Sequence, residues 1–292
     1  MRSDPSIRIP VELSNPGQFF ACCGLLELAD RLWPGAEGWF EDDRFHICSD
    51  GSFFGLIESL RRASVNNTMS SGQLARLEEL SRMTKKQREA IPGAEEEKKQ
   101  LESLRRELPI RLTGDVSLRI DWFTDEEAGG SRFKTWAGQQ SVLDIARAMH
   151  GGVHDPAIVD EATLWANVRG IGLPFFFDSD LGGEGSGLDI GFSFDPLSGS
   201  EATRIEGTSR PGLELLAFIG LQRFRPREFS GENRFVYVAW NQPLPPCVAA
   251  CAVCQVMPME APAFEFRLLY RTKYLKSFLP ALPFEGDFDE QA

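Results

Sequence analysis

The sequence has few of the features that mark membrane, secreted or histidine-dependent proteins. Its 292 residues contain no run of eighteen apolar residues, and the N-terminus carries no apolar segment of the kind removed on export. We therefore expect neither membrane insertion nor secretion, and predict a cytoplasmic protein. Six cysteines in a chain of this size without an export signal are expected to be reduced thiols.

Catalytic signatures are scarce as well. Only three histidines occur, and none stands in a His-Glu-x-x-His pattern. The phosphate-binding loop of nucleotide hydrolases, a nucleophile elbow and a catalytic-cysteine signature are all missing from the sequence. The sequence therefore predicts a protein that is not an enzyme, with no cofactor and no metal.

The sequence has fewer basic than acidic residues: 31 lysines and arginines against 43 aspartates and glutamates, for a net charge of -12. Phosphate contacts need clustered lysine and arginine, so this balance argues against a protein that coats nucleic acid with its whole surface. It is compatible with a local basic face, and equally with a subunit that docks on basic partners.

The clearest structural pattern surrounds residues 14–33. A period-two strand over residues 7–13 precedes an Asn-Pro-Gly break. A helix follows it, with one apolar core face and with Glu27, Asp30 and Arg31 on the other side. A hairpin over residues 38–48 and a second helix, Phe53 to Ala63, continue the chain. The resulting β-α-β-β-α order predicts an α+β fold of the ferredoxin-like, RNA-recognition type, with an antiparallel sheet and helices on one side.

A change of composition at residues 70–108 predicts an insertion. This stretch is rich in Leu, Glu, Lys, Arg and Gln and is interrupted by Ile-Pro-Gly, which favours a helical hairpin with nearly balanced charge. Its charges are interpreted as a solvated face or, alternatively, as a nucleic-acid or partner-binding arm. We predict one ferredoxin-like domain over residues 1–284 carrying this hairpin, followed by an acidic tail at 285–292.

Two clusters of cations are candidate nucleic-acid contacts. Arg132, Lys134 and Trp136 follow a Gly-Gly loop at alternate positions, which would offer two phosphate partners and a stacking face. Arg223, Arg225 and Arg227 lie at the basic end of a predicted amphipathic helix. The alternative is ordinary surface arginines and a core tryptophan.

Two further clusters are weaker candidates for metal binding. Carboxylates gather around the Gly-rich stretch 182–187, but their spacing lacks a calcium-loop pattern. Three cysteines near residue 250 lack a fourth zinc ligand, so we expect them to be buried thiols. The carboxylates are Asp178, Asp180, Glu184, Asp189 and Asp195, and the cysteines are Cys247, Cys251 and Cys254.

Four phrases taken in order resemble a family of CRISPR-associated proteins, the small Csb-class subunit of type I-U (I-G) systems. They are NPGQFFACCGLLELADRLW, FKTWAGQQSVLDIARAM, DIGFSFDP and LELLAFIGLQRFRP, and they span Asn15 to Pro226. The resemblance implies a bacterial cytoplasmic protein linked to an RNA-guided surveillance complex, whose relatives commonly use ferredoxin-like RNA-binding folds.

We therefore expect a non-catalytic subunit or accessory protein of that effector complex in antiviral defence. It would bind partner subunits, with guide RNA or target DNA as a further partner and no membrane. Three alternatives stay open: an endoribonuclease that trims guide RNA and uses His46, a protein scaffold without nucleic-acid contact, and a metal-dependent nuclease built on the carboxylates near residue 182.

Overall fold

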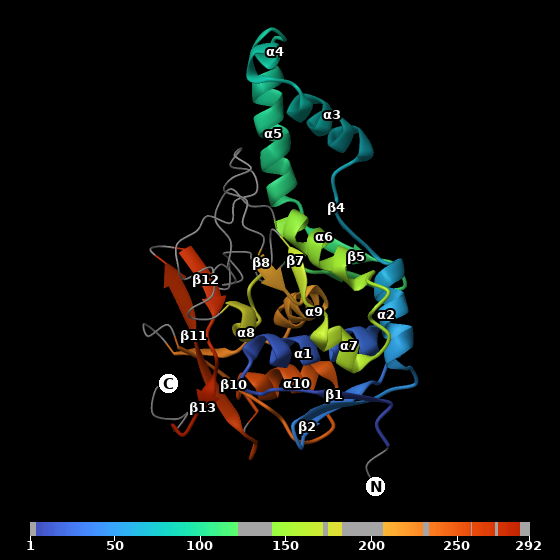
Figure 1. The fold of residues 1–292 in the computed structure, drawn as a ribbon, viewed down its shortest axis with the longest axis vertical. Helices are drawn as coiled ribbons and strands as arrows, with labels where there is room; N and C mark the ends of the chain where they lie inside the picture. The colour runs from blue at the N-terminus through green and yellow to red at the C-terminus, as the bar shows by residue number, and fades with distance from the viewer. Residues whose placement is uncertain are drawn as a thin grey trace.

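The computed structural model describes residues 4–121, 142–171, 175–182, 207–229, 234–257, 259–271 and 274–286. In these ranges the chain is a mixed α+β protein, with helices packed among small antiparallel sheets (Figure 1). None of the helices described is long and apolar enough to cross a membrane.

The first sheet follows the order predicted from the sequence. Its strands pair antiparallel in the order β1-β3-β2. Asp42 and Asp43 turn the hairpin with positive φ angles of 49° and 56°, as a tight primed turn requires. The elements are, in order, β1 (Ile7–Pro10), α1 (Pro16–Leu32), β2 (Glu37–Glu41), β3 (Arg44–Cys48) and α2 (Phe53–Arg62).

A ferredoxin-like sheet needs a fourth strand beside β1, and β4 (Ser64–Asn67) does not take that place. It pairs instead with β5 (Ile110–Thr113), and β6 (Ser117–Arg119) completes a second sheet. β4 enters the helical insertion and β5 leaves it, so the two strands that flank the insertion pair with each other. The β-α-β-β-α order is thus present, but the first sheet has three strands among the described residues and lacks the fourth strand of a ferredoxin-like sheet.

The third sheet is built from the last part of the chain and is joined to the first. Its strand order is β12-β11-β10-β9. β13 pairs with Phe264 and Glu265 of β11, on the edge opposite β10. The Phe40 N–H donates to Trp240 O at 2.8 Å, and Trp240 Nε1–H donates to Gly38 O at 2.6 Å. The strands are β9 (Arg227–Phe229), β10 (Arg234–Val238), β11 (Ala263–Arg271), β12 (Tyr274–Phe278) and β13 (Leu282–Pro283), and a separate pair is β7 (Arg169–Ile171) with β8 (Gly207–Ser209).

Helices α1 and α9 (Pro211–Leu221) lie against each other at the centre of the molecule (Figure 1). Every residue of α9 is buried, as is α1 from Pro16 to Ala29. The sequence predicts one polar and one apolar face for each helix, and this is wrong. Residues far along the chain cover the second face of α1; the ring of Tyr237 in β10, for example, stacks 4.1 Å from that of Phe19.

Two glycines allow this close packing. A Cβ placed on Gly24 would lie 2.0 Å from the backbone oxygen of Leu216, and one on Gly220 would lie 2.1 Å from the backbone oxygen of Phe20. Because these neighbours are backbone atoms, a rotamer change cannot relieve the clash. The two helices approach as they do because neither position carries a side chain.

The insertion forms an arm that projects from the body of the molecule (Figure 1). α3 and α4 begin with capping boxes at Ser70 and Thr84, and Gly93 enters α5 with a φ of +80°. Leu77, Leu80 and Ala94 are buried in the arm. The arm has one helix on either side of the Ile-Pro-Gly break and one additional short helix: the elements are α3 (Ser71–Arg82), α4 (Lys85–Glu89) and α5 (Ala94–Glu107).

The remaining helices surround the central pair. Arg61 of α2 anchors the segment after α6, since its guanidinium donates to the backbone oxygens of Val153, Asp155 and Ile158 at 3.1, 3.0 and 2.8 Å. α6 also packs against α9 and β4. These helices are α6 (Val142–Val153), α7 (Glu161–Ala166), α8 (Ser179–Gly182) and α10 (Pro246–Val253).

Candidate functional site

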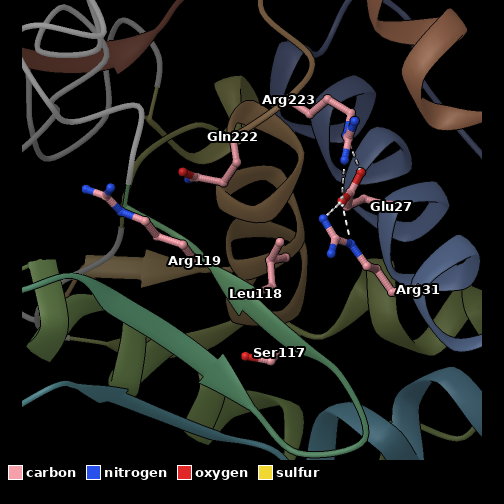
Figure 2. A pocket seen from close by; sticks show the side chains of 7 residues that line it. All are labelled: Glu27, Arg31, Ser117, Leu118, Arg119, Gln222 and Arg223. Atoms are coloured by element: carbon pink, nitrogen blue, oxygen red, sulfur yellow. Dashed lines mark hydrogen bonds and ion pairs between the residues drawn. The ribbon is translucent and has the colours of Figure 1, made fainter.

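A pocket of about 500 Å³ opens where α1, β6 and the turn after α9 meet (Figure 2). Three arginines line it, each from a different one of these elements, together with a single carboxylate. The lining residues are Glu27, Arg31, Ser117, Leu118, Arg119, Gln222 and Arg223. On a chain of net charge -12, this gathering of guanidinium groups is the feature that most resembles a binding site.

Glu27 holds two of the arginines together. Its side chain is 4 % exposed, and it accepts from Arg31 Nε at 2.9 Å and from Arg223 Nε at 2.6 Å. The hydrogen bonds that Arg223 donates to Glu27 raise the pKa of Arg223 further above its ordinary value. Asp30 also acts electrostatically on Arg223, so the charges on this side of the pocket are balanced. Each guanidinium carries five N–H donors, so both arginines keep donors beyond those that Glu27 accepts.

The crossing of α1 and α9 explains how residues so distant in sequence meet. Glu27 lies one turn after Gly24, and Arg223 lies just beyond Gly220, so the close glycine contact aligns the ends of both helices. Gln222 fixes the third element, because its amide donates to Ile120 O at 2.7 Å and to Phe218 O at 2.8 Å. The C-terminal end of β6 is thereby held against the end of α9.

Arg119 stands on the opposite wall, on β6. Figure 2 shows its guanidinium directed away from Glu27, while Arg31 and Arg223 converge on that carboxylate. Arg119 Nε donates to Asp121 at 3.0 Å, and its side chain is 40 % exposed. The pocket thus presents guanidinium groups at two separate places, each beside a carboxylate, rather than one cluster around a single anion.

The structure brings only part of the predicted basic surface to this pocket. Arg223 lines it, whereas Arg225 is half-buried, with burial lowering its pKa, and Arg227 places its guanidinium 5.7 Å from the centre of the Phe229 ring. Arg132, Lys134 and Trp136 fall in 122–141, outside the described residues.

Sequence reasoning missed Arg31 and Arg119. Arg31 stands on the helix face taken as solvated, four residues after Glu27, and that spacing is the only local signal that the two interact. Arg119 is one polar position of an alternating strand. Neither position shows by itself that the two side chains share a pocket.

The described residues show no arrangement that supports the two catalytic alternatives, the endoribonuclease and the metal-dependent nuclease. His46 stacks on Trp39 with ring centres 5.2 Å apart, and Asp178 and Asp180 are both bound by Arg210, at 2.7 and 3.0 Å. Within the described ranges no three His, Cys, Asp or Glu side chains are grouped to hold a metal. The three carboxylates of that prediction from Glu184 onward lie outside the described residues.

A buried polar network lies near the first turn of α1. Asp178 accepts from Asn15 Nδ2 at 2.8 Å and from Arg210, and Glu214 accepts two consecutive backbone N–H groups, each at 3.0 Å. Burial and the neighbouring Asp178 raise the pKa of Glu214 to about 8, against the lowering effect of its hydrogen bonds. The network joins α1, α9 and the segment before α8, and lies apart from the arginine pocket.

The arm's cations are mostly engaged with carboxylates of the arm itself. Arg76 pairs with Glu97 at 2.7 Å, Arg88 pairs with Glu95 at 2.7 Å, and four further pairs follow the same scheme. This favours the interpretation of the arm as a solvated helical hairpin. The other pairs are Arg76–Glu79, Arg82–Glu78, Lys85–Glu89 and Lys98–Glu102.

The three cysteines of α10 are not the buried thiols that we predicted. Cys247 and Cys251 are exposed and Cys254 is half-buried, whereas Cys22 and Cys23 in α1 are fully buried. The prediction failed because α10 packs through the face that carries Ala249 and Ala252, and these cysteines stand on its other sides.

Comparison of the chain with protein-family models, with curated proteins and with solved structures finds no match.

Proposed function

We propose that the protein is a non-catalytic subunit or accessory protein of a type I-U CRISPR effector complex that binds single-stranded nucleic acid at the arginine pocket. The proposal joins the resemblance of four sequence phrases to one structural observation. That observation is the meeting of Arg31, Arg119 and Arg223, from three separate elements, in one pocket. The proposal includes a location in the bacterial cytoplasm and other effector subunits as partners, both of which rest on the resemblance.

Guanidinium groups suit phosphate because their fork of N–H donors matches two phosphate oxygens. Arg31 and Arg223 are preorganised by Glu27, so little side-chain entropy is lost when a phosphate binds them. Arg119, paired with Asp121, supplies a further guanidinium group across the pocket. This spacing favours successive phosphates of one strand over a single small anion.

The pocket's size also favours a single strand. A volume of about 500 Å³ is of the order of a small-ligand site and has no room for a duplex, which is read on a broad surface. The apolar Leu118 and the neutral Ser117 would face the sugar or base. The acidic remainder of the chain would confine nucleic acid to this site, since it repels phosphate elsewhere.

The fold supports the same proposal in part. The β1-α1-β2-β3-α2 unit has the element order and strand order of the first part of a ferredoxin-like fold. We infer that it is a ferredoxin-like unit whose fourth strand has been drawn into the sheet at the base of the arm. In such a complex the arm, whose own charges are largely paired, would remain a solvated hairpin.

Binding of labelled single-stranded RNA, single-stranded DNA and duplex DNA to the purified chain tests the proposal. Arg31→Gln and Arg119→Gln should each weaken single-strand binding several-fold at low salt. Arg82→Gln is the matched control, because Arg82 is an exposed arm residue paired with Glu78, and it should leave binding unchanged. Absence of binding by the wild type, or equal losses in all three variants, would favour a protein scaffold instead.

A further inference from the structure

Three cysteines lie on the exposed sides of α10 and at its C-terminal end, and none of them lines the arginine pocket. Cys251 and Cys254 form a Cys-Ala-Val-Cys sequence, and Cys247 lies one turn earlier. Cys251 is exposed and Cys254 is half-buried. We propose that Cys251 and Cys254 are a redox-active dithiol that closes to a reversible disulfide through exchange with a small disulfide of the glutathione class.

The spacing selects this pair. Cα atoms three positions apart in a helix are about 5 Å from each other, inside the range of about 4.4–6.8 Å seen across disulfides. Residues seven positions apart, as Cys247 and Cys254 are, are separated by roughly 10 Å along the axis and cannot bond. Cys247 and Cys251 have a suitable Cα separation, but both lie inside α10, where the helical hydrogen bonds hold their Cβ atoms apart.

The end of α10 can adapt to the bond. Cys254 is the C-cap residue, and Gln255 leaves the helix with a φ of +56°. The Gln255 N–H donates to Ala252 O at 3.0 Å, a contact across three residues that tightens the last turn and brings side chains three apart over one another. The Cys254 thiol lies over the last turn, with Sγ 3.4 Å from the Ala250 carbonyl oxygen and 3.7 Å from that of Cys251. The Cys251 thiol donates to Cys247 O at 3.5 Å, so its side chain must turn toward Cys254 before the bond forms.

The surroundings admit a small disulfide. From Gln242 to Met259 the chain carries no charged residue, so no nearby carboxylate of this segment repels the acidic glutathione molecule. Val256, next to the pair, is 76 % exposed. The exposed Cys251 would therefore meet the reagent first, and Cys254 would act second.

The exchange balances in two steps. The Cys251 thiolate attacks glutathione disulfide, which forms a mixed disulfide and releases one glutathione thiolate. The Cys254 thiolate then attacks the Cys251 sulfur and releases the second glutathione. Overall the protein loses two thiol protons and two electrons, and glutathione disulfide is reduced to two thiols. A disulfide formed in an adapted helix end is expected to be readily reversible, as strained and exposed disulfides are.

Intact-mass analysis after equilibration with glutathione and glutathione disulfide, without denaturant, tests this inference. The wild type and Cys247→Ser should lose about 2 Da, the mass of two hydrogens, and recover it with dithiothreitol. Cys251→Ser and Cys254→Ser should not show this loss, and peptide mapping should join residues 251 and 254. A protein that keeps its mass, or a loss that Cys247→Ser abolishes, would overturn the proposal. The outcome does not depend on nucleic-acid binding.

Discussion

Replacement of Gly24 by alanine should destabilise the protein although alanine is the better helix former. The new Cβ would lie 2.0 Å from Leu216 O, whereas ordinary contacts of a Cβ begin near 3.4 Å. The obstacle is backbone, so α1 and α9 must move apart by more than 1 Å. That movement loosens contacts along the whole central helix pair.

The magnitude follows from two opposing terms. Overpacking of a well-packed core costs about 1–3 kcal/mol, and alanine in place of glycine in a helix gains about 1 kcal/mol at most. Because the contact is with backbone we expect the upper part of the first range, and a net loss of roughly 1–2 kcal/mol in the free energy of unfolding. Separation of the helices would also stretch the 2.6 Å contact between Glu27 and Arg223.

Gly151→Ala is the matched control. Gly151 lies in α6, and a Cβ built on it meets nothing within 4 Å. Alanine there should therefore stabilise the protein by about 0.5–1 kcal/mol. Urea unfolding of the two variants, with equal slopes, should shift the midpoint in opposite directions. A Gly24→Ala variant at least as stable as Gly151→Ala would refute the close-packing argument.

Three further predictions concern stability and the arm. Glu214 has a folded-state pKa of about 8 against an ordinary value of 4.5, so the folded protein binds more protons between these values and stability should fall as the pH rises from about 5 to 8. The fall in the free energy of unfolding can reach about 1.4 kcal/mol per pH unit. Glu214→Gln should flatten this pH dependence, measured as urea midpoints. A variant with the same pH profile as the wild type would contradict the assignment of the dependence to Glu214. Replacement of residues 70–107 by a short Gly-Ser linker should leave the body of the molecule folded, because β4 and β5 pair and Asn67 faces Ile110 at the base of the arm. Thermal unfolding measures this, and loss of a cooperative transition would show that the arm supports the core. Leu80→Ala should lower the stability of the arm by about 2–5 kcal/mol, since Leu80 is fully buried there. Amide hydrogen exchange should become faster in α3 and α5 alone. An equal acceleration across the body of the molecule would contradict this.

Local patterns predicted the elements better than they predicted their arrangement. The alternation before Asn15, the Asp42-Asp43 turn and the Ile-Pro-Gly break in the arm each act on neighbouring residues, and strands, hairpin and helices lie where these signals put them. Strand partners depend on distant segments, which is why no local pattern indicated that the chain at Ser64–Asn67 forms a strand that pairs with β5. The all-round burial of α1 and α9 escaped prediction for the same reason.

The candidate site shows the same limit. Arg223 could be proposed because basic residues cluster after an apolar helix. Arg31 and Arg119 could not be proposed as its neighbours. In the sequence Arg31 has the pattern of a solvated helix residue, and Arg119 that of a residue on the exposed side of a strand. Only the glycine-mediated crossing of α1 and α9 and the attachment of β6 through Gln222 bring these residues together. The burial of Glu27, a charged residue on an expected polar face, is the clearest consequence of that crossing.

The salt dependence of single-stranded RNA binding tests the central proposal most directly. For a single strand, the logarithm of the binding constant falls against the logarithm of salt concentration with a slope of about -0.7 per phosphate contacted. The Arg119→Gln variant should bind with a slope shallower by roughly 0.7 than that of the wild type, whereas Arg82→Gln should keep the wild-type slope. An Arg119→Gln slope equal to that of the wild type would contradict a phosphate contact at the pocket.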